Sequence, residues 1–276
     1  MNELPIGVMM SAGWTLDQLR QVRDLGFDNV QIHAPSEDVL EDPNRSAALI
    51  RDINSVGIQI TTVFAGFSGE SYADIPTVRD TVGYLNPSKR EERIRITEQI
   101  SDFAAALGVD KVAAHIGFVP EDPNHPDHHA MVQCVRRLAD YCGRNGQDFC
   151  LETGQETAAA LRHFLDTLNR KNVGVNFDPA NMILYGSGEP IEALDIVAGY
   201  VVSVHAKDGK WPPGEGQLGT EFPLGSGDVG MDRFIAKLKE IGYRGPITME
   251  REIPDWDRKV RDLAQGKNLL ESLIKL

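Results

Sequence analysis

Short apolar runs rich in β-branched residues recur along the chain and alternate with longer segments of mixed polarity. Runs of this length and composition predict β-strands. The expected strands cover residues 5–10, 29–34, 59–65, 111–117, 148–154, 173–178, 201–206 and 246–251.

The longer segments place apolar residues three to four positions apart, which is the period of an amphipathic helix. Thr15 is a suitable N-cap for the first of them, Gly26 is suited to end it, and several others also end in glycine just before the next strand. The expected helices cover residues 15–26, 46–57, 89–108, 127–145, 157–168, 189–199, 231–242 and 255–275.

This pattern alternates strand and helix eight times. It predicts an α/β protein with the (β/α)8 TIM barrel fold, in which parallel strands form a barrel inside a ring of helices. A doubly wound open sheet is the alternative, but no G-x-G-x-x-G fingerprint opens the first helix. No linker divides the chain, so residues 1–276 are expected to form a single domain. The longer loops then lie on the C-terminal face, where barrel enzymes build their active sites: 66–88, 118–127 and 207–230.

Composition and charge narrow the class of protein further. The chain carries 28 Lys+Arg and 41 Asp+Glu, a formal net charge of −13, which argues against a nucleic-acid binder because such proteins usually carry a basic surface. No apolar run reaches the roughly 18 residues of a membrane span. The N-terminus lacks a secretory signal pattern, so a cytoplasmic location is expected. Cys134, Cys142 and Cys150 are expected to be reduced structural thiols, because their spacing does not match a zinc site.

Four residues with metal-ligand chemistry stand at the C-terminal ends of the last four expected strands. They are Glu152, Asp178, His205 and Glu250. Three carboxylates and an imidazole at one end of a barrel would repel one another without a cation. Mostly oxygen ligands with one nitrogen suit Mn²⁺ best, with Mg²⁺ or Co²⁺ as alternatives. Taken singly, each residue could instead be an ordinary polar group at a strand–loop junction.

Five further residues are candidates for binding substrate. His33 and His115 end the second and fourth strands and could bind hydroxyls or move a proton, or simply be hydrogen-bonded at the barrel rim. Lys207 lies two residues after His205, so both should face the same side. Asn181 and Glu156 follow the sixth and fifth strands, although Glu156 could merely favour a helix N-terminus.

Three other features have simpler interpretations beside functional ones. The histidines in the segment 121–129 are expected at a solvated helix start: His125, His128 and His129. The backbone N–H groups of residues 225–228 (GSGD) could hold an anion or a sugar oxygen, or form a plain loop. Trp211 could form one wall of the pocket or pack under its own loop.

The sequence resembles the xylose isomerase-like TIM barrels, a family of sugar phosphate isomerases and epimerases. The resemblance covers essentially the whole chain and is most specific at LETG (151–154), NFDPAN (176–181), VHAKDG (204–209), GSGD (225–228) and TMERE (248–252). It implies one metal held by Glu152, Asp178, His205 and Glu250. The family's common histidine three residues after the strand-six aspartate is Asn181 here, which counts against an endonuclease-type multi-zinc cluster. Family members are commonly dimers or tetramers, so a homo-oligomer is left open.

The expected activity is proton transfer next to the carbonyl of a small sugar or sugar-like polyol. A divalent metal would stabilise the enediolate, and Glu152 and Glu250 are the candidate catalytic acid and base. Such an enzyme would be an isomerase or epimerase. The first alternative is a lyase or dehydratase acting on a 3-keto-glycoside or inosose. An apurinic-type endonuclease and a non-catalytic sugar-binding barrel are less favoured, and neither a nucleic-acid nor a membrane partner is expected.

Overall fold

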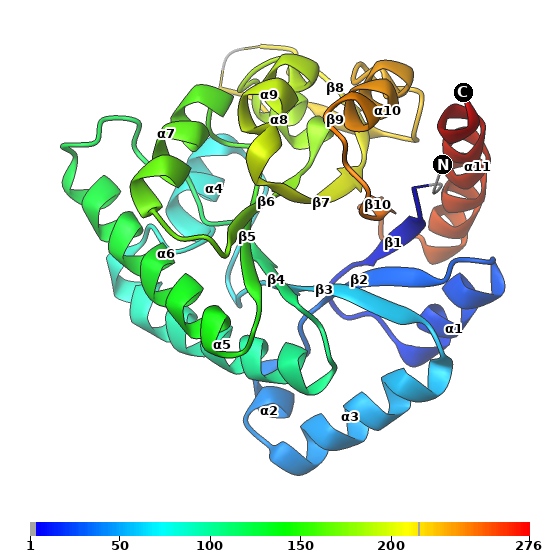
Figure 1. The fold of residues 1–276 in the computed structure, drawn as a ribbon, viewed down its shortest axis with the longest axis horizontal. Coiled ribbons are helices and arrows are strands. Elements are labelled where there is room, and N and C mark those ends of the chain that lie inside the picture. The colour runs from blue at the N-terminus through cyan, green and yellow to red at the C-terminus, as the bar shows by residue number, and fades with distance from the viewer. Residues whose placement is uncertain (1–3, 215) are drawn as a thin grey trace.

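Each expected apolar run forms one strand of a closed barrel of parallel strands in the computed structural model, which describes residues 4–214 and 216–276 (Figure 1). Around the barrel the strands follow one another in the order β1, β10, β7, β6, β5, β4, β3 and β2. Their bounds are Ile6–Met10 (β1), Asn29–His33 (β2), Gln59–Ala65 (β3), Lys111–Ala114 (β4), Asp148–Glu152 (β5), Val173–Phe177 (β6), Val201–Ala206 (β7) and Ile247–Met249 (β10). The predicted (β/α)8 fold is confirmed.

Helices surround the barrel, and each predicted helix forms within a few residues of its expected bounds (Figure 1). Thr15 caps the first with a capping box that includes Gln18, and Gly26 follows its end with a positive φ of 81°. The bounds are Leu16–Asp24 (α1), Pro43–Val56 (α3), Pro87–Ala106 (α5), Pro126–Arg144 (α6), Ala158–Leu168 (α7), Pro190–Val197 (α9), Met231–Glu240 (α10) and Trp256–Lys275 (α11).

Several short elements stand where the sequence pattern predicted loops or gave no signal. Helix α8 follows β6 directly, and β8 and β9 pair as an antiparallel hairpin inside the long loop after β7. The additional bounds are Glu37–Leu40 (α2), Ile75–Thr81 (α4), Pro179–Tyr185 (α8), Ala198–Tyr200 (a 3₁₀ turn), Asp208–Lys210 (β8) and Thr220–Phe222 (β9). Apart from the 3₁₀ turn, which lies just before the start of β7, these elements follow the ends of strands and help to build that face of the barrel.

The two sides of the strands differ in chemistry. The large apolar core lies between strands and helices and includes Val8, Leu151 and Phe177. A second, much smaller apolar cluster contains Met9, Phe64, Ala113 and Cys150. Alternate strand residues face the same side, so Glu152 in β5 shares a side with Cys150. The barrel interior is therefore a thin apolar layer with polar groups above it.

Other details of the described residues bear on earlier expectations. All three cysteines are free and buried, as expected. His125 caps α6 and is exposed, but His128 in the next turn is 2% exposed, so the interpretation of a solvated helix start is wrong for His128. It packs edge-on against Phe164 of α7. No helix among the described residues is long and apolar enough to cross a membrane.

Candidate metal-binding active site

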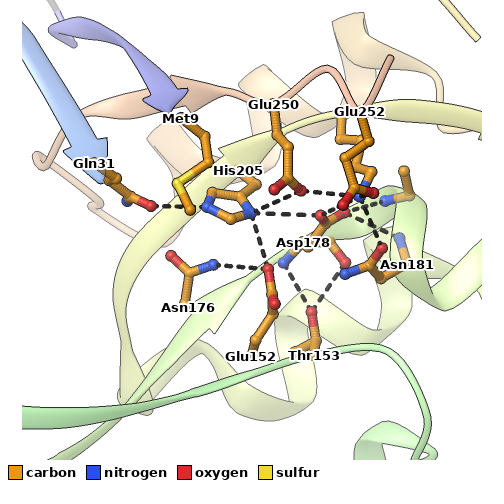
Figure 2. Close-up of polar contacts among 12 residues, drawn as sticks. Met9, Gln31, Glu152, Thr153, Asn176, Asp178, Asn181, His205, Glu250 and Glu252 are labelled. Carbon is orange, nitrogen blue, oxygen red and sulfur yellow. Dashed lines mark hydrogen bonds and ion pairs between the residues drawn. The ribbon is translucent and has the colours of Figure 1, made fainter. Parts of the chain in front are cut away.

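Four neighbouring strands bring four ligand-type side chains together at the C-terminal end of the barrel (Figure 2). Glu152 is the last residue of β5, Asp178 follows β6, His205 lies in β7 and Glu250 follows β10. One nitrogen or carboxylate oxygen from each lies within 4.8 Å of the others. The parallel register sets this common height: the last residues of adjacent β7 and β10, Ala206 and Met249, are partners, and Glu250 N donates to Ala206 O.

The imidazole is the centre of this cluster. His205 Nδ1 lies 3.0 Å from Glu152 Oε1, 3.4 Å from Asp178 Oδ2 and 3.4 Å from Glu250 Oε2. The side chains of His205 and Asp178 are fully buried, and those of Glu152 and Glu250 are nearly so. Burial alone would lower the pKa of His205, but the carboxylates of Glu250, Asp178 and Glu152 raise it well above its usual value. The site therefore strongly favours a positive charge at this position.

A divalent cation fits the donor set better than a proton does. His205 Nδ1 and Asp178 Oδ2 are both buried without a hydrogen-bond partner among the described residues. The other oxygen of Asp178 is already used, because it accepts the N–H groups of Ala180 and Asn181 as the N-cap of α8. One free lone pair on each of these two side chains thus points into the cluster. Three carboxylate oxygens and one imidazole nitrogen are ligands suited to Mn²⁺ or Mg²⁺.

Gln31, which the sequence analysis did not single out, orients the imidazole. Its Oε1 lies 2.7 Å from His205 Nε2 (Figure 2). Its amide nitrogen donates to Ser203 Oγ at 2.7 Å. Because a carboxamide oxygen only accepts, His205 Nε2 carries the proton and Nδ1 is directed at the carboxylates. Such outer partners of metal-binding histidines tune ligand basicity. A signal was present, since Gln31 lies two residues before His33 on the same side of β2.

Changing Gln31 to leucine is expected to weaken Mn²⁺ binding about 10- to 100-fold, because the imidazole loses the partner that fixes its orientation. Isothermal titration with Mn²⁺ measures the change. Ser203→Ala is the matched control, and it should have a smaller effect since it removes only the contact behind Gln31. Unchanged affinity in Gln31→Leu would contradict this role.

Lys207 and Asn181 lie together beside the cluster. Lys207 Nζ lies 2.9 Å from Glu250 Oε2, 2.6 Å from Glu252 Oε2 and 3.2 Å from Asn181 Oδ1. Burial alone would lower the pKa of Lys207, but Glu250, Glu252 and Asp178 raise it well above its usual value. The lysine is therefore a buried ammonium ion. Glu252 was missed, although it lies two residues after Glu250.

A cavity of about 820 Å³ opens over the cluster and is large enough for a small ligand. His33 and His115 both line it. His115 Nε2 lies 3.3 Å from Glu152 Oε2, and its Nδ1 is 2.5 Å from the amide nitrogen of Gln155. Since that amide nitrogen donates, His115 Nε2 carries the proton that faces Glu152. Burial lowers the pKa of His33 despite nearby carboxylates, so its ring is neutral at pH 7.

Two tyrosines that the sequence analysis did not single out also line this cavity, whereas Trp211 and Glu156 do not. Tyr72 belongs to the predicted loop 66–88, just before α4, whereas Tyr185 comes from α8, which the pattern did not predict. Trp211 is 41% exposed and lies outside the lining. Glu156 also lies outside it and instead lines a separate small pocket with His128 and Phe164. The structure therefore does not bring Glu156 into the cavity.

Glu156 provides a pH-dependent test of stability. Its burial raises the pKa from 4.5 to about 7, so the folded protein holds a proton that the unfolded chain has already released in this interval. Stability therefore falls as pH rises from about 4.5 to about 7. Glu156→Gln cannot ionise and is expected to be more stable than wild type by roughly 3 kcal/mol at pH 8, with little difference near pH 4.5. Urea unfolding at both pH values measures this, and equal stabilities at pH 8 would count against a buried, protonated Glu156.

Comparison with known proteins shows which family the chain belongs to. The family model described as xylose isomerase-like TIM barrel matches residues 19–273. The crystal structure of a xylose isomerase domain protein from Planctomyces limnophilus is 44% identical, with a TM-score of 0.93, and the match covers 99% of this chain and 98% of that one.

Two curated relatives are named as epimerases. An L-ribulose 3-epimerase from a Methylomonas species is 30% identical over 178 residues, which is 59% of this chain and 56% of that relative. The L-ribulose-5-phosphate 3-epimerase UlaE of Escherichia coli is 24% identical over 281 residues, covering 95% of this chain and 91% of that relative. Both the sequence match over most of its length and the structural similarity place this chain in the xylose isomerase-like TIM barrel family.

Proposed function

We propose that this protein is a divalent-metal-dependent epimerase that inverts a ketose carbon next to the carbonyl group. The observation that carries the proposal is the cluster of Glu152, Asp178, His205 and Glu250 at the floor of a sugar-sized cavity. The epimerase relatives support the reaction class. These four residues would hold the metal, Mn²⁺ being our first choice, and the bound ion would polarise the substrate carbonyl and stabilise the charge that develops on its oxygen.

Glu152 and Glu250 are the proposed acid and base. Burial alone would raise the pKa of Glu250, but Lys207 and His205 hold it well below its usual value. Burial likewise opposes ionisation of Glu152, while His115 and His205 lower its pKa. Both carboxylates can therefore accept a proton at pH 7. One would take the proton from the carbon, and the other would pass a proton from its cationic or N–H neighbour to the opposite face.

Each carboxylate has a neighbour that can assist this transfer. His115 faces Glu152 Oε2 and Lys207 contacts Glu250 Oε2. Both neighbours line the cavity together with Asn181 and His33, which gives donors and acceptors for substrate hydroxyl groups. We propose that these four residues bind and orient the sugar. Because Glu156 lies in another pocket, we do not propose that it binds substrate. Its buried carboxyl group instead affects the stability of the fold.

The test is a panel of ketopentoses and ketohexoses incubated with the Mn²⁺-loaded protein in D₂O and analysed by mass spectrometry. We expect the epimer to appear with one deuterium at the inverted carbon, and no exchange after chelation. Loss of a substituent with an enone product would replace the epimerase by a lyase or dehydratase. Movement of the carbonyl to the neighbouring carbon would instead indicate an isomerase.

A further inference from the structure

The loop after the seventh barrel strand contains a ready anion-binding cradle. In TIM barrels the loops after strands seven and eight frequently bind phosphate through backbone N–H groups. Here β7 is the seventh strand, and its loop includes the glycines of the segment 225–228. The N–H groups of Gly225, Gly227 and Val229 converge on one point, so this loop has the form that would hold a phosphate group.

The carboxylate of Asp208 already occupies this cradle. Gly225 N and Gly227 N donate to Asp208 Oδ2 at 2.9 and 3.0 Å, and Val229 N donates to Asp208 Oδ1 at 3.2 Å. Gly209 N also donates to Oδ1, at 2.9 Å. Both carboxylate oxygens thus accept two N–H groups each, which leaves none of these donors for a ligand.

The cradle is also closed sterically. Asp208 is only 2% exposed, and a Cβ atom added at Gly227 would lie 2.2 Å from Asp208 Oδ1. The glycine is therefore needed for close approach to an internal carboxylate rather than to a substrate. By binding the carboxylate of Asp208, the loop is held in place at the rim of the barrel.

The charges around the cavity also disfavour a phosphate group. Its lining among the described residues includes five carboxylates and one ammonium group, and no arginine: Glu70, Glu152, Glu221, Glu250, Glu252 and Lys207. Lys207 already lies within 4 Å of Asp178, Glu250 and Glu252. Arg251 follows Glu250 but is paired with Glu221 at 2.9 Å and Asp262 at 2.8 Å. A phosphate dianion entering the cavity would therefore meet repulsion and no free cation.

From these observations we infer that the substrate is an uncharged keto sugar: the acidic cavity wall repels phosphate esters, and the backbone N–H groups of the loop, already bound to Asp208, offer them no site. Calling this sugar the substrate rests on the proposed function. The preference for an uncharged sugar concerns binding alone, so it can be tested apart from catalysis. A divalent ion in the site does not remove the repulsion, because three carboxylates of its own ligand set already offset its charge. One curated relative is named for L-ribulose and another for L-ribulose 5-phosphate. The inference therefore predicts that this protein binds the first kind of sugar, which carries no phosphate group.

The first test compares L-ribulose with L-ribulose 5-phosphate by isothermal titration on the Mn²⁺-loaded protein. We expect the free sugar to bind about 100-fold more tightly than its phosphate. Equal or tighter binding of the phosphate overturns the inference. Deuterium exchange is measured separately, so absence of exchange with a bound sugar would overturn the proposed function while the order of affinities stands.

The second test opens the cradle. Asp208→Ser removes the carboxylate that accepts these four N–H groups and is expected to bind inorganic phosphate at least about tenfold more tightly than wild type. Asp228→Ser, at an exposed position in the same loop, removes the same charge without freeing these N–H groups and is the matched control. A folded Asp208→Ser protein that gains no phosphate binding, or a wild-type protein that binds inorganic phosphate in the cavity, would overturn the inference.

Discussion

Replacing Glu152 by glutamine is expected to lower kcat for deuterium exchange by a factor of about 10³ to 10⁴. The amide matches the carboxylate in shape, but it cannot take a proton from carbon at neutral pH and is a weaker metal ligand. One oxygen of Glu152 lies 3.0 Å from His205 Nδ1 and the other 3.3 Å from His115 Nε2. The substitution therefore affects both the oxygen that would bind the metal and the oxygen that would take part in proton transfer.

Two measurements separate these effects. Titration with Mn²⁺ gives the loss of metal affinity, and exchange at saturating Mn²⁺ gives the loss that belongs to proton transfer. Glu192→Gln, on the exposed face of α9, is the matched control and should leave both unchanged. A Glu152→Gln protein that exchanges at the wild-type rate when saturated with metal would show that Glu152 is not the acid or base.

Removing the metal is expected to have the second large effect. Asp178 and His205 are completely buried, and the cluster around them concentrates three negative charges in a small volume. An ion that binds only the folded chain stabilises it by about 4 kcal/mol at a concentration 1,000 times its Kd. For a chain of this size the melting temperature should rise by about 10 °C.

Thermal unfolding followed by circular dichroism tests this expectation with and without Mn²⁺, and again after chelation. Asp178→Asn is an informative control because it keeps the helix-capping oxygen while removing the charge that faces the cluster. Its melting temperature should depend much less on Mn²⁺. If Mn²⁺ leaves the melting temperature of the wild-type protein unchanged, the cluster does not hold the ion.

The arrangement of the four ligand-type residues could be predicted because it depends on local rules. Apolar runs place the strands, parallel strands of a barrel end at one face, and Glu152, Asp178, His205 and Glu250 each stand where a run ends. The same logic places Lys207 on the side of His205. The structure brings all five together, although the sequence contains no direct contact information.

The remaining features depend on contacts between distant segments. Helix α8 is buried along most of its length, so it lacks the polar face that would mark it as an amphipathic helix. Gln31 reaches His205 across 174 positions of the chain. The sequence left the GSGD loop open as an anion site or a plain loop, and its N–H groups bind the carboxylate of Asp208, which the β8–β9 hairpin directs toward them. Burial of His128 and Glu156 in one small pocket likewise follows from the packing of α6 beside α7.

The most direct measurement is anomalous diffraction from crystals of the wild-type protein soaked in Mn²⁺. We expect one strong peak per chain, in direct contact with Glu152, Asp178, Glu250 and His205 Nδ1, while His205 Nε2 keeps its contact with Gln31. A fully folded protein with no peak at this position, or with its Mn²⁺ bound by other side chains, would contradict the proposed metal centre and the epimerase mechanism built on it.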